Sequence, residues 1–138
     1  MIVLDTNVVS ELMRPSPAPE VVAWLRRQDG ASLATTAITV AEVRFGLVRL
    51  PEGRRATQLR RLADDALASF PAQVLPFDIS AAELYGDLAA RRERAGRPID
   101  ALDAQIAAIC VFRAASLATR NTKDFVDTGV DLFDPWTA

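Results

Sequence analysis

Short apolar runs alternate along the chain with longer segments in which apolar residues recur at helical spacing. Runs without internal alternation are typical of parallel strands that are buried on both faces. The pattern predicts strands over Ile2–Leu4, Ser32–Thr35, Val74–Phe77, Ser116–Thr119 and Asp131–Phe133. It predicts helices over Val8–Met13, Pro19–Arg27, Thr39–Leu50, Arg54–Phe70, Ser80–Ala95 and Asp103–Ala114. This alternation indicates an α/β fold with a mostly parallel central sheet flanked by helices on both faces.

The length of the chain indicates a single domain over residues 1–138. Half of its residues are hydrophobic, which is enough for a core, and the sequence shows no repeat or linker. No apolar run approaches the ~20 residues of a membrane span. Met1–Asp5 also lacks the basic and apolar regions of a signal peptide. We therefore expect a cytoplasmic protein that does not enter a membrane.

Two predicted helix starts carry the Ser/Thr-x-x-Glu spacing of a capping box. Thr39 and Glu42 form one such pair, and Ser80 and Glu83 form the other. In a capping box the hydroxyl and the carboxylate each accept a hydrogen bond from a backbone N–H of the first turn. On this interpretation the helices begin at Thr39 and Ser80.

The composition excludes several kinds of chemistry. The chain contains no histidine, and its one cysteine, Cys110, lies in an apolar run. Ser-His-Asp and Cys-His catalysis, histidine-ligated zinc and an internal disulfide are therefore excluded. The formal net charge of −2 does not mark a nucleic-acid binder, so any RNA contact would need a local basic patch.

Acidic and amide side chains follow the predicted strands or open the neighbouring helices. Asp5 follows the first strand, and Glu42 lies in the helix after the second. Asp103 opens the helix before the fourth strand, and Asn121 and Asp124 follow that strand. Ligands of open α/β sheets bind beyond the carboxyl ends of the strands, so these side chains can converge there. Oxygen ligands of this kind suit Mg²⁺, which can activate a water against a phosphodiester.

Each acid also has an interpretation that needs no metal. Asp5 can cap the following helix, and Glu42 can belong to a capping box. Asp103 follows Asp100 by three residues, which is typical of an N-cap and an acidic first turn. Asp124 can cap or turn a surface loop. Composition and spacing alone therefore allow a metal site without demonstrating one.

The same residues carry a family resemblance. Five segments, in register and nearly end to end, resemble the motifs of PIN-domain proteins, and in particular the FitB-like branch of the VapC toxins. The segments are Leu4–Val8, Thr39–Gly46, Pro98–Ala108, Thr119–Asn121 with Asp124–Phe125, and Phe133–Trp136. The resemblance implies an endoribonuclease toxin that uses Mg²⁺ or Mn²⁺. It also implies a homodimer and a cognate VapB- or FitA-like antitoxin, through which alone the chain would meet DNA.

The resemblance also assigns roles to residues. Asp5, Glu42 and Asp103 match the acidic positions of the family, and Asn121 and Asp124 complete the expected metal site. Asn121 departs from those relatives that carry an acid at its position, so a second metal position is left open. We expect four further side chains to lie beside the ligands rather than among them: Thr6, Asn7, Asp100 and Thr119.

Arginines gather in two stretches, six of them from Arg44 to Arg61 and four from Arg91 to Arg97. They can form solvated helix faces, hold RNA phosphates, or meet an acidic antitoxin segment. Several apolar residues are expected in the core but would form a dimer or antitoxin surface if exposed. These are Leu84, Tyr85, Leu88, Val48 and Leu50.

Three other functions fit parts of the sequence. A phosphatase with Asp5 as nucleophile needs a second acid close behind, where this chain has Asn7. A receiver-like module needs an acceptor aspartate paired with a late lysine, and Lys123 has no clear partner of this kind. A PIN fold that binds RNA or a partner without cutting it stays open until activity is measured with and without metal.

Overall fold

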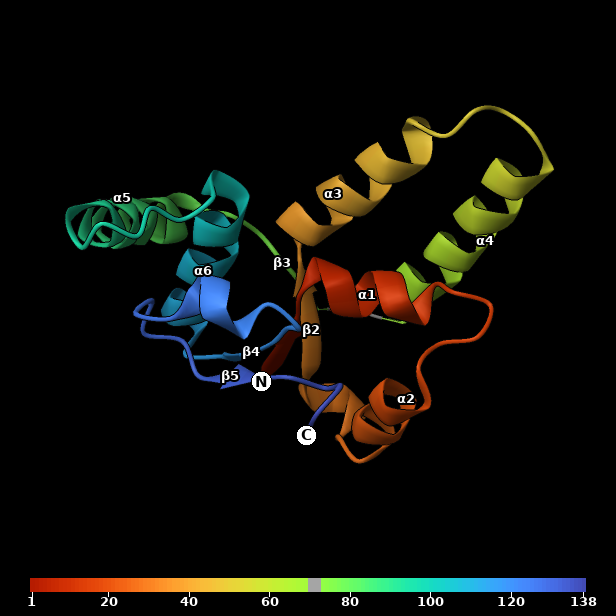
Figure 1. Ribbon diagram of the computed structural model, residues 1–138, viewed down its shortest axis with the longest axis horizontal. Helices are drawn as coiled ribbons and strands as arrows, with labels where there is room; N and C mark the ends of the chain where they lie inside the picture. The colour runs from red at the N-terminus through yellow and green to blue at the C-terminus, as the bar shows by residue number, and fades with distance from the viewer. Residues whose placement is uncertain (70–72) are drawn as a thin grey trace.

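The computed structural model describes residues 1–69 and 73–138. Each element predicted from the pattern is present, and its ends differ by a few residues from the prediction (Figure 1). The strands are β1 (Ile2–Leu4), β2 (Leu33–Thr36), β3 (Val74–Leu75), β4 (Ser116–Ala118) and β5 (Leu132–Phe133). The helices are α1 (Thr6–Leu12), α2 (Pro19–Arg26), α3 (Ala37–Val48), α4 (Arg54–Ala68), α5 (Ile79–Arg94) and α6 (Ala101–Arg113). Two single 3₁₀ turns are η1 (Gly30–Ser32) and η2 (Thr122–Phe125).

The strand expected to reach Phe77 stops at Leu75, because Pro76 has no N–H to donate to a neighbouring strand. The helix expected to reach Phe70 is described as far as Ala68, and Phe70 itself lies outside the described residues.

The five strands form one sheet in the order β3-β2-β1-β4-β5, and every described pair is parallel. From β1 the chain moves outward through β2 to β3, then returns to the other side of β1 with β4. This reversal makes the carboxyl ends of β1 and β4 the switch point at which such sheets bind ligands. The Asp5 N–H donates to the Ala118 carbonyl over 3.0 Å, so the two strand ends lie side by side.

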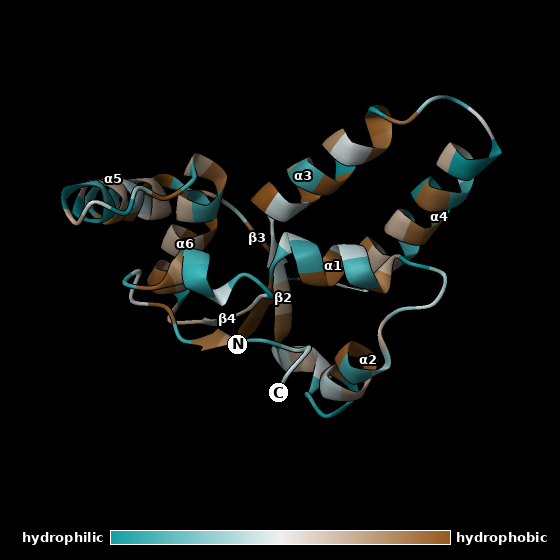
Figure 2. Cartoon of the chain, viewed as in Figure 1, coloured by the Kyte–Doolittle hydropathy of each residue, from teal (hydrophilic) through white to brown (hydrophobic). Residues whose placement is uncertain are grey.

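Alternate residues of the central strands enter two separate cores. Val3 packs with the buried residues of α5 and α6, whereas Leu4 packs with those of α1, α2 and α4. Figure 1 accordingly shows α5 and α6 on one side of the strands and α1 and α4 on the other. Figure 2 shows hydrophobic and hydrophilic residues in turn along α4, as expected for a helix that buries one stripe. The prediction of helices on both faces of a parallel sheet is confirmed.

The central helix is α6, which is buried on most sides as its apolar sequence predicts. Cys110 is fully buried within it and belongs to the core. Among the described residues, none of the helices has the length and apolar character that a membrane crossing requires.

Both predicted capping boxes are wrong. The N-cap of α3 is Thr36, whose Oγ1 accepts a hydrogen bond of 3.1 Å from the Thr39 N–H. The N-cap of α5 is Asp78, whose Oδ1 accepts one of 3.0 Å from the Ala81 N–H. Each cap residue still has the extended backbone that an N-cap adopts, so both helices begin before the predicted position. Glu42 therefore has no capping role.

Candidate active site

The structure brings four of the five predicted metal ligands together in one pocket of about 580 Å³. Asp5 comes from the end of β1, Glu42 from α3, Asp103 from the first turn of α6, and Asn121 from the segment after β4. The pocket forms because α3 packs against both α1 and α6. It lies at the switch point of the sheet, where the sequence predicted it.

Asp5 is held on both of its carboxylate oxygens and is only 4% exposed. Oδ1 accepts from the Thr6 N–H over 2.8 Å, which confirms that Asp5 caps α1. Oδ2 accepts from the Thr119 hydroxyl over 2.7 Å and from Asn7 Nδ2 over 3.4 Å. Burial raises the pKa of Asp5, and the bonds from Thr119 and Thr6 work against that rise. The side chain of Asp5 therefore both caps α1 and lines the pocket.

Glu42 points to the same cluster from α3. Its Oε1 accepts a hydrogen bond of 2.8 Å from the Thr6 hydroxyl, which also lies 3.1 Å from the Thr39 hydroxyl. Burial raises the pKa of Glu42, the bond from Thr6 lowers it, and repulsion from Asp5 and Asp100 raises it further. Thr6 directly follows Asp5 in the chain, so its hydroxyl orients Glu42 beside Asp5.

Asp103 carries the clearest electrostatic mark of a crowded acidic site. Burial and the nearby charges of Asp5, Asp100, Glu42 and Asp124 raise its pKa to about 7. Its own neighbour Asp100 is the N-cap of α6 and accepts from the Asp103 N–H over 3.4 Å, as the sequence predicted. Carboxylates that repel one another in this way would be relieved by a bound cation.

Asp124 lies beside this pocket rather than in it. It lines an adjoining cavity of about 200 Å³ together with Asp103, Asp100 and Arg92. Asp103 lines both spaces, so it connects Asp124 with the other acids. The Asp124 N–H donates to the Asn121 carbonyl over 2.9 Å and so belongs to the 3₁₀ turn that follows Asn121.

Thr119 connects the two strand ends of the site. Besides donating to Asp5, its hydroxyl accepts from Asn7 Nδ2 and from the Asn121 N–H, each over 3.1 Å. Asn7 Oδ1 in turn accepts from the Arg120 N–H over 3.2 Å. The four neighbours expected beside the ligands, which are Thr6, Asn7, Asp100 and Thr119, all contact the acids or the segments that carry them.

Residues 2–130 match the PIN domain family. The chain belongs to the PIN-domain family. It is 44% identical to the VapC ribonuclease Y4jK of Sinorhizobium fredii, over 99% of this chain and 98% of that relative. It is 39% identical to toxin FitB of Neisseria gonorrhoeae, over 99% of both chains. A solved structure of FitAB bound to an IR36 DNA fragment superposes with a TM-score of 0.91 at 39% identity, covering 99% of this chain and 96% of that one.

The oxygen donors of this PIN-domain pocket suit a hard divalent cation. Carboxylate and amide oxygens are the ligands that Mg²⁺ and Mn²⁺ prefer. Within residues 1–69 and 73–138 no three acidic or thiol side chains are already arranged as a complete ligand group. Mg²⁺ does not need one, because it keeps several waters and takes one or two carboxylates together with substrate phosphates. The residues present therefore fit such an ion.

Three lining residues were missed from the sequence: Ser10, Glu11 and Arg14. Ser10 and Glu11 extend the pocket along α1, three and four positions after Asn7, so helical spacing could have revealed them, and Arg14 follows just beyond the end of α1. Glu11 is buried, accepts from the Ala18 N–H over 2.9 Å and pairs with Arg14 at 3.3 Å.

The arginines and apolar residues named from the sequence have varied surroundings. Arg44 pairs with Asp64 at 2.7 Å, which joins α3 to α4. Leu88 is buried, and Leu84 and Tyr85 are partly buried, as predicted. Val48 is not part of the core, however, because it lies on the outer face of α3 and is 76% exposed. Phe45 on the same helix is 63% exposed, so α3 presents apolar surface to solvent.

Proposed function

We propose that this PIN-domain protein is a metal-dependent endoribonuclease and the toxin of a VapBC-like toxin–antitoxin pair, acting as one domain. The observation that carries the proposal is the acidic pocket. Asp5, Glu42 and Asp103 line it from three separate elements, and crowding raises the pKa of Asp103 to about 7. A VapC ribonuclease and a toxin are similar to this chain over nearly its whole length, which supports the same activity here.

In the proposed reaction Asp5 and Asp103 would hold the cation, with Asn121 as a neutral oxygen donor. When bound, Mg²⁺ or Mn²⁺ lowers the pKa of a water and stabilises the charge that develops on the phosphodiester. Glu42 orients the attacking water and takes its proton, because Thr6 occupies Oε1 and leaves Oε2 for the water. The water oxygen bonds to phosphorus while the bond to the leaving ribose oxygen breaks, and that oxygen takes a proton from solvent. Asp124 adds negative charge beside Asp103.

We propose that the partner is a VapB- or FitA-like antitoxin, and that the toxin is a cytoplasmic homodimer outside any membrane. FitAB, the complex named in the structure cited above, was solved on DNA. By analogy this chain would contact DNA only indirectly, through its antitoxin. Phe45 and Val48 give α3 an exposed apolar face on which a partner can dock. The guanidinium of Arg49 lies 5.3 Å from the centre of the Phe45 ring and adds a positive charge to that face.

The decisive test is RNA cleavage by the purified toxin with Mg²⁺, with Mn²⁺ and with EDTA. Asp5→Asn removes a proposed ligand charge, whereas Asp87→Asn changes an exposed acid of α5 and serves as the matched control. We expect cleavage by the wild type and the control only when metal is present, and none by Asp5→Asn. RNA binding without cleavage under all three conditions would instead identify a non-catalytic PIN-fold protein.

A further inference from the structure

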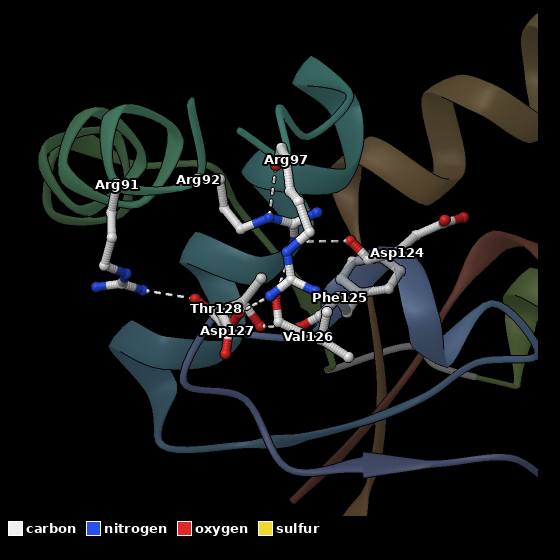
Figure 3. Close-up of polar contacts among 8 residues, drawn as sticks. All are labelled: Arg91, Arg92, Arg97, Asp124, Phe125, Val126, Asp127 and Thr128. Atoms are coloured by element: carbon white, nitrogen blue, oxygen red, sulfur yellow. Dashed lines mark hydrogen bonds and ion pairs between the residues drawn. The ribbon is translucent and has the colours of Figure 1, made fainter. Parts of the chain in front are cut away.

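A buried arginine next to the acidic pocket has no acidic partner. Arg92 lies near the end of α5 and is 5% exposed, and none of the ion pairs among the described residues includes it. Its guanidinium donates instead to backbone carbonyls, from Nε to Arg97 over 2.8 Å and from Nη1 to Asp124 over 3.0 Å and Val126 over 2.8 Å (Figure 3). Burying a cation without an acidic partner costs free energy of folding. We therefore expect the buried Arg92 to have a role that offsets this cost.

The three carbonyls belong to the two segments that carry acids of the site. Arg97 lies in the connection from α5 to α6, which leads directly to Asp100 and Asp103. Asp124 and Val126 lie in the segment after β4. The Arg97 N–H also donates back to the Arg92 carbonyl over 3.0 Å, so the first segment is attached at two points. Arg92 therefore joins the segment of Asp103 to the segment of Asp124.

Two neighbouring arginines also attach the segment after β4 to α5 and to the connection that follows α5. Arg91 donates to the Asp127 carbonyl over 3.0 Å, and the side chains of Arg97 and Asp127 form an ion pair (Figure 3). Asp127 has a φ of 60°, a left-handed conformation that a non-glycine residue adopts only at a cost. The Thr128 hydroxyl donates to the Phe125 carbonyl over 2.6 Å and closes the turn. Three of the four clustered arginines thus bind their own chain.

Arg92 lies close to the acidic side chains themselves, besides binding the backbone segments that carry them. It lines the cavity of about 200 Å³ together with Asp100, Asp103 and Asp124. We propose that Arg92 is a positioning residue for the metal site, and this inference rests on the proposed function. It holds Asp124 at a fixed distance from Asp103 across that cavity, so that Asp124 can support the divalent cation.

The test is a double-mutant cycle that measures Mn²⁺ binding by calorimetry. Arg92→Lys keeps the charge, but its compact ammonium cannot reproduce the fork by which Nε and Nη1 reach the three carbonyls. Arg94→Met, on the exposed face of the same turn, is the control. Loss of a residue that supports ligands typically weakens metal binding by about 10- to 100-fold. We expect about a 10-fold loss for Arg92→Lys in the wild-type background, almost none in the Asp124→Asn background, and none for Arg94→Met.

A purely structural arginine gives a different pattern. Equal losses in both backgrounds, or a folded Arg92→Lys that binds Mn²⁺ as the wild type does, would overturn the inference. A wild type that neither binds Mn²⁺ nor cuts RNA would refute the proposed function itself, and the inference with it. If Arg92→Lys does not fold, Asp127→Asn replaces it, because asparagine tolerates the left-handed backbone and removes only the ion pair with Arg97. Loss of that ion pair loosens the segment that carries Asp124, so Mn²⁺ binding should weaken by less than the ~10-fold expected for Arg92→Lys. Unchanged binding would count against the inference.

Discussion

The hydroxyl of Thr119 donates a hydrogen bond of 2.7 Å to the carboxylate of Asp5, across 114 positions of sequence. This bond joins the carboxyl ends of β4 and β1, the two strands at the switch point of the sheet. Burial raises the pKa of Asp5, and this hydrogen bond lowers it. The bond therefore favours the charged carboxylate that a metal ion needs. The fold and the chemistry of the pocket are thus linked through one hydroxyl.

Thr119→Val should therefore weaken metal binding without removing any ligand. Valine keeps the shape of threonine but leaves Asp5 without its hydroxyl donor, so the pKa of Asp5 rises. We expect Mn²⁺ affinity and cleavage to fall by about 10-fold, with a greater loss at pH 6 than at pH 8. Thr119→Ser retains the hydroxyl and should behave nearly as the wild type. Equal behaviour of the valine and serine variants would show that the hydrogen bond has no role in the site.

Glu42→Gln separates catalysis from stability. Because Thr36 caps α3 and Glu42 does not, the substitution should leave the melting temperature nearly unchanged. Cleavage should fall by about 10²-fold or more, since glutamine cannot take a proton from water. Thr36→Ala is the contrasting variant and should cost about 1 kcal/mol of stability through the lost cap. Thermal melts and cleavage rates of both variants would decide, and a fully active Glu42→Gln would remove Glu42 from the reaction.

The position of the pocket could be predicted from local pattern, but the roles within it could not. Apolar runs followed by Asp5 and Asn121 place polar groups at strand ends, and parallel strands bring those ends together. The Thr39-x-x-Glu42 spacing suggested a cap, because a spacing rule does not show where the preceding strand stops. β2 continues through Thr36, and its pairing with β3 decides that end. Local sequence does not encode that pairing.

The arginines illustrate a second limit. Arg91, Arg92 and Arg94 stand within one helical turn and look alike in sequence, as candidates for a solvated face or a phosphate site. Only Arg92 is buried among them, because the segment after β4 folds over its side of α5. That segment is more than 25 residues away in sequence, so no periodicity within α5 reveals the contact.

Asp103→Asn should stabilise the metal-free protein in a pH-dependent way. The pKa of Asp103 is about 7 in the folded chain, above the ordinary aspartate value of 3.8. The folded state therefore binds this proton more tightly, and the wild type loses stability as pH rises from about 4 to about 7. Asparagine does not ionise, so the variant does not lose stability in this way. In EDTA the variant should melt a few degrees higher than the wild type at pH 8 and at the same temperature at pH 4. Mn²⁺ should stabilise only the wild type. A variant less stable than the wild type at pH 8 would contradict the crowding of charge.

Asn121 and Asp124 decide how many cations the site holds. Asn121 lines the main pocket without adding charge, while Asp124 lines the adjoining cavity. We therefore expect one cation to bind tightly and a second only when RNA phosphate supplies further oxygens. Asn121→Asp adds a carboxylate beside Asp5, Glu42 and Asp103 in the main pocket and should strengthen Mn²⁺ binding in the free protein. Asp124→Asn should weaken it, and should slow cleavage less than Asp5→Asn does.

Calorimetric titration of Mn²⁺ into the wild type and both variants measures this difference. Asn121→Asp should also lower the melting temperature in EDTA, since it adds a carboxylate to acids that already repel one another. Mn²⁺ should then raise that temperature by more than it does in the wild type, because the same charge that opposes folding without metal favours the cation. Three identical isotherms would place the segment after β4 outside the metal site and leave Asp5, Glu42 and Asp103 to act alone.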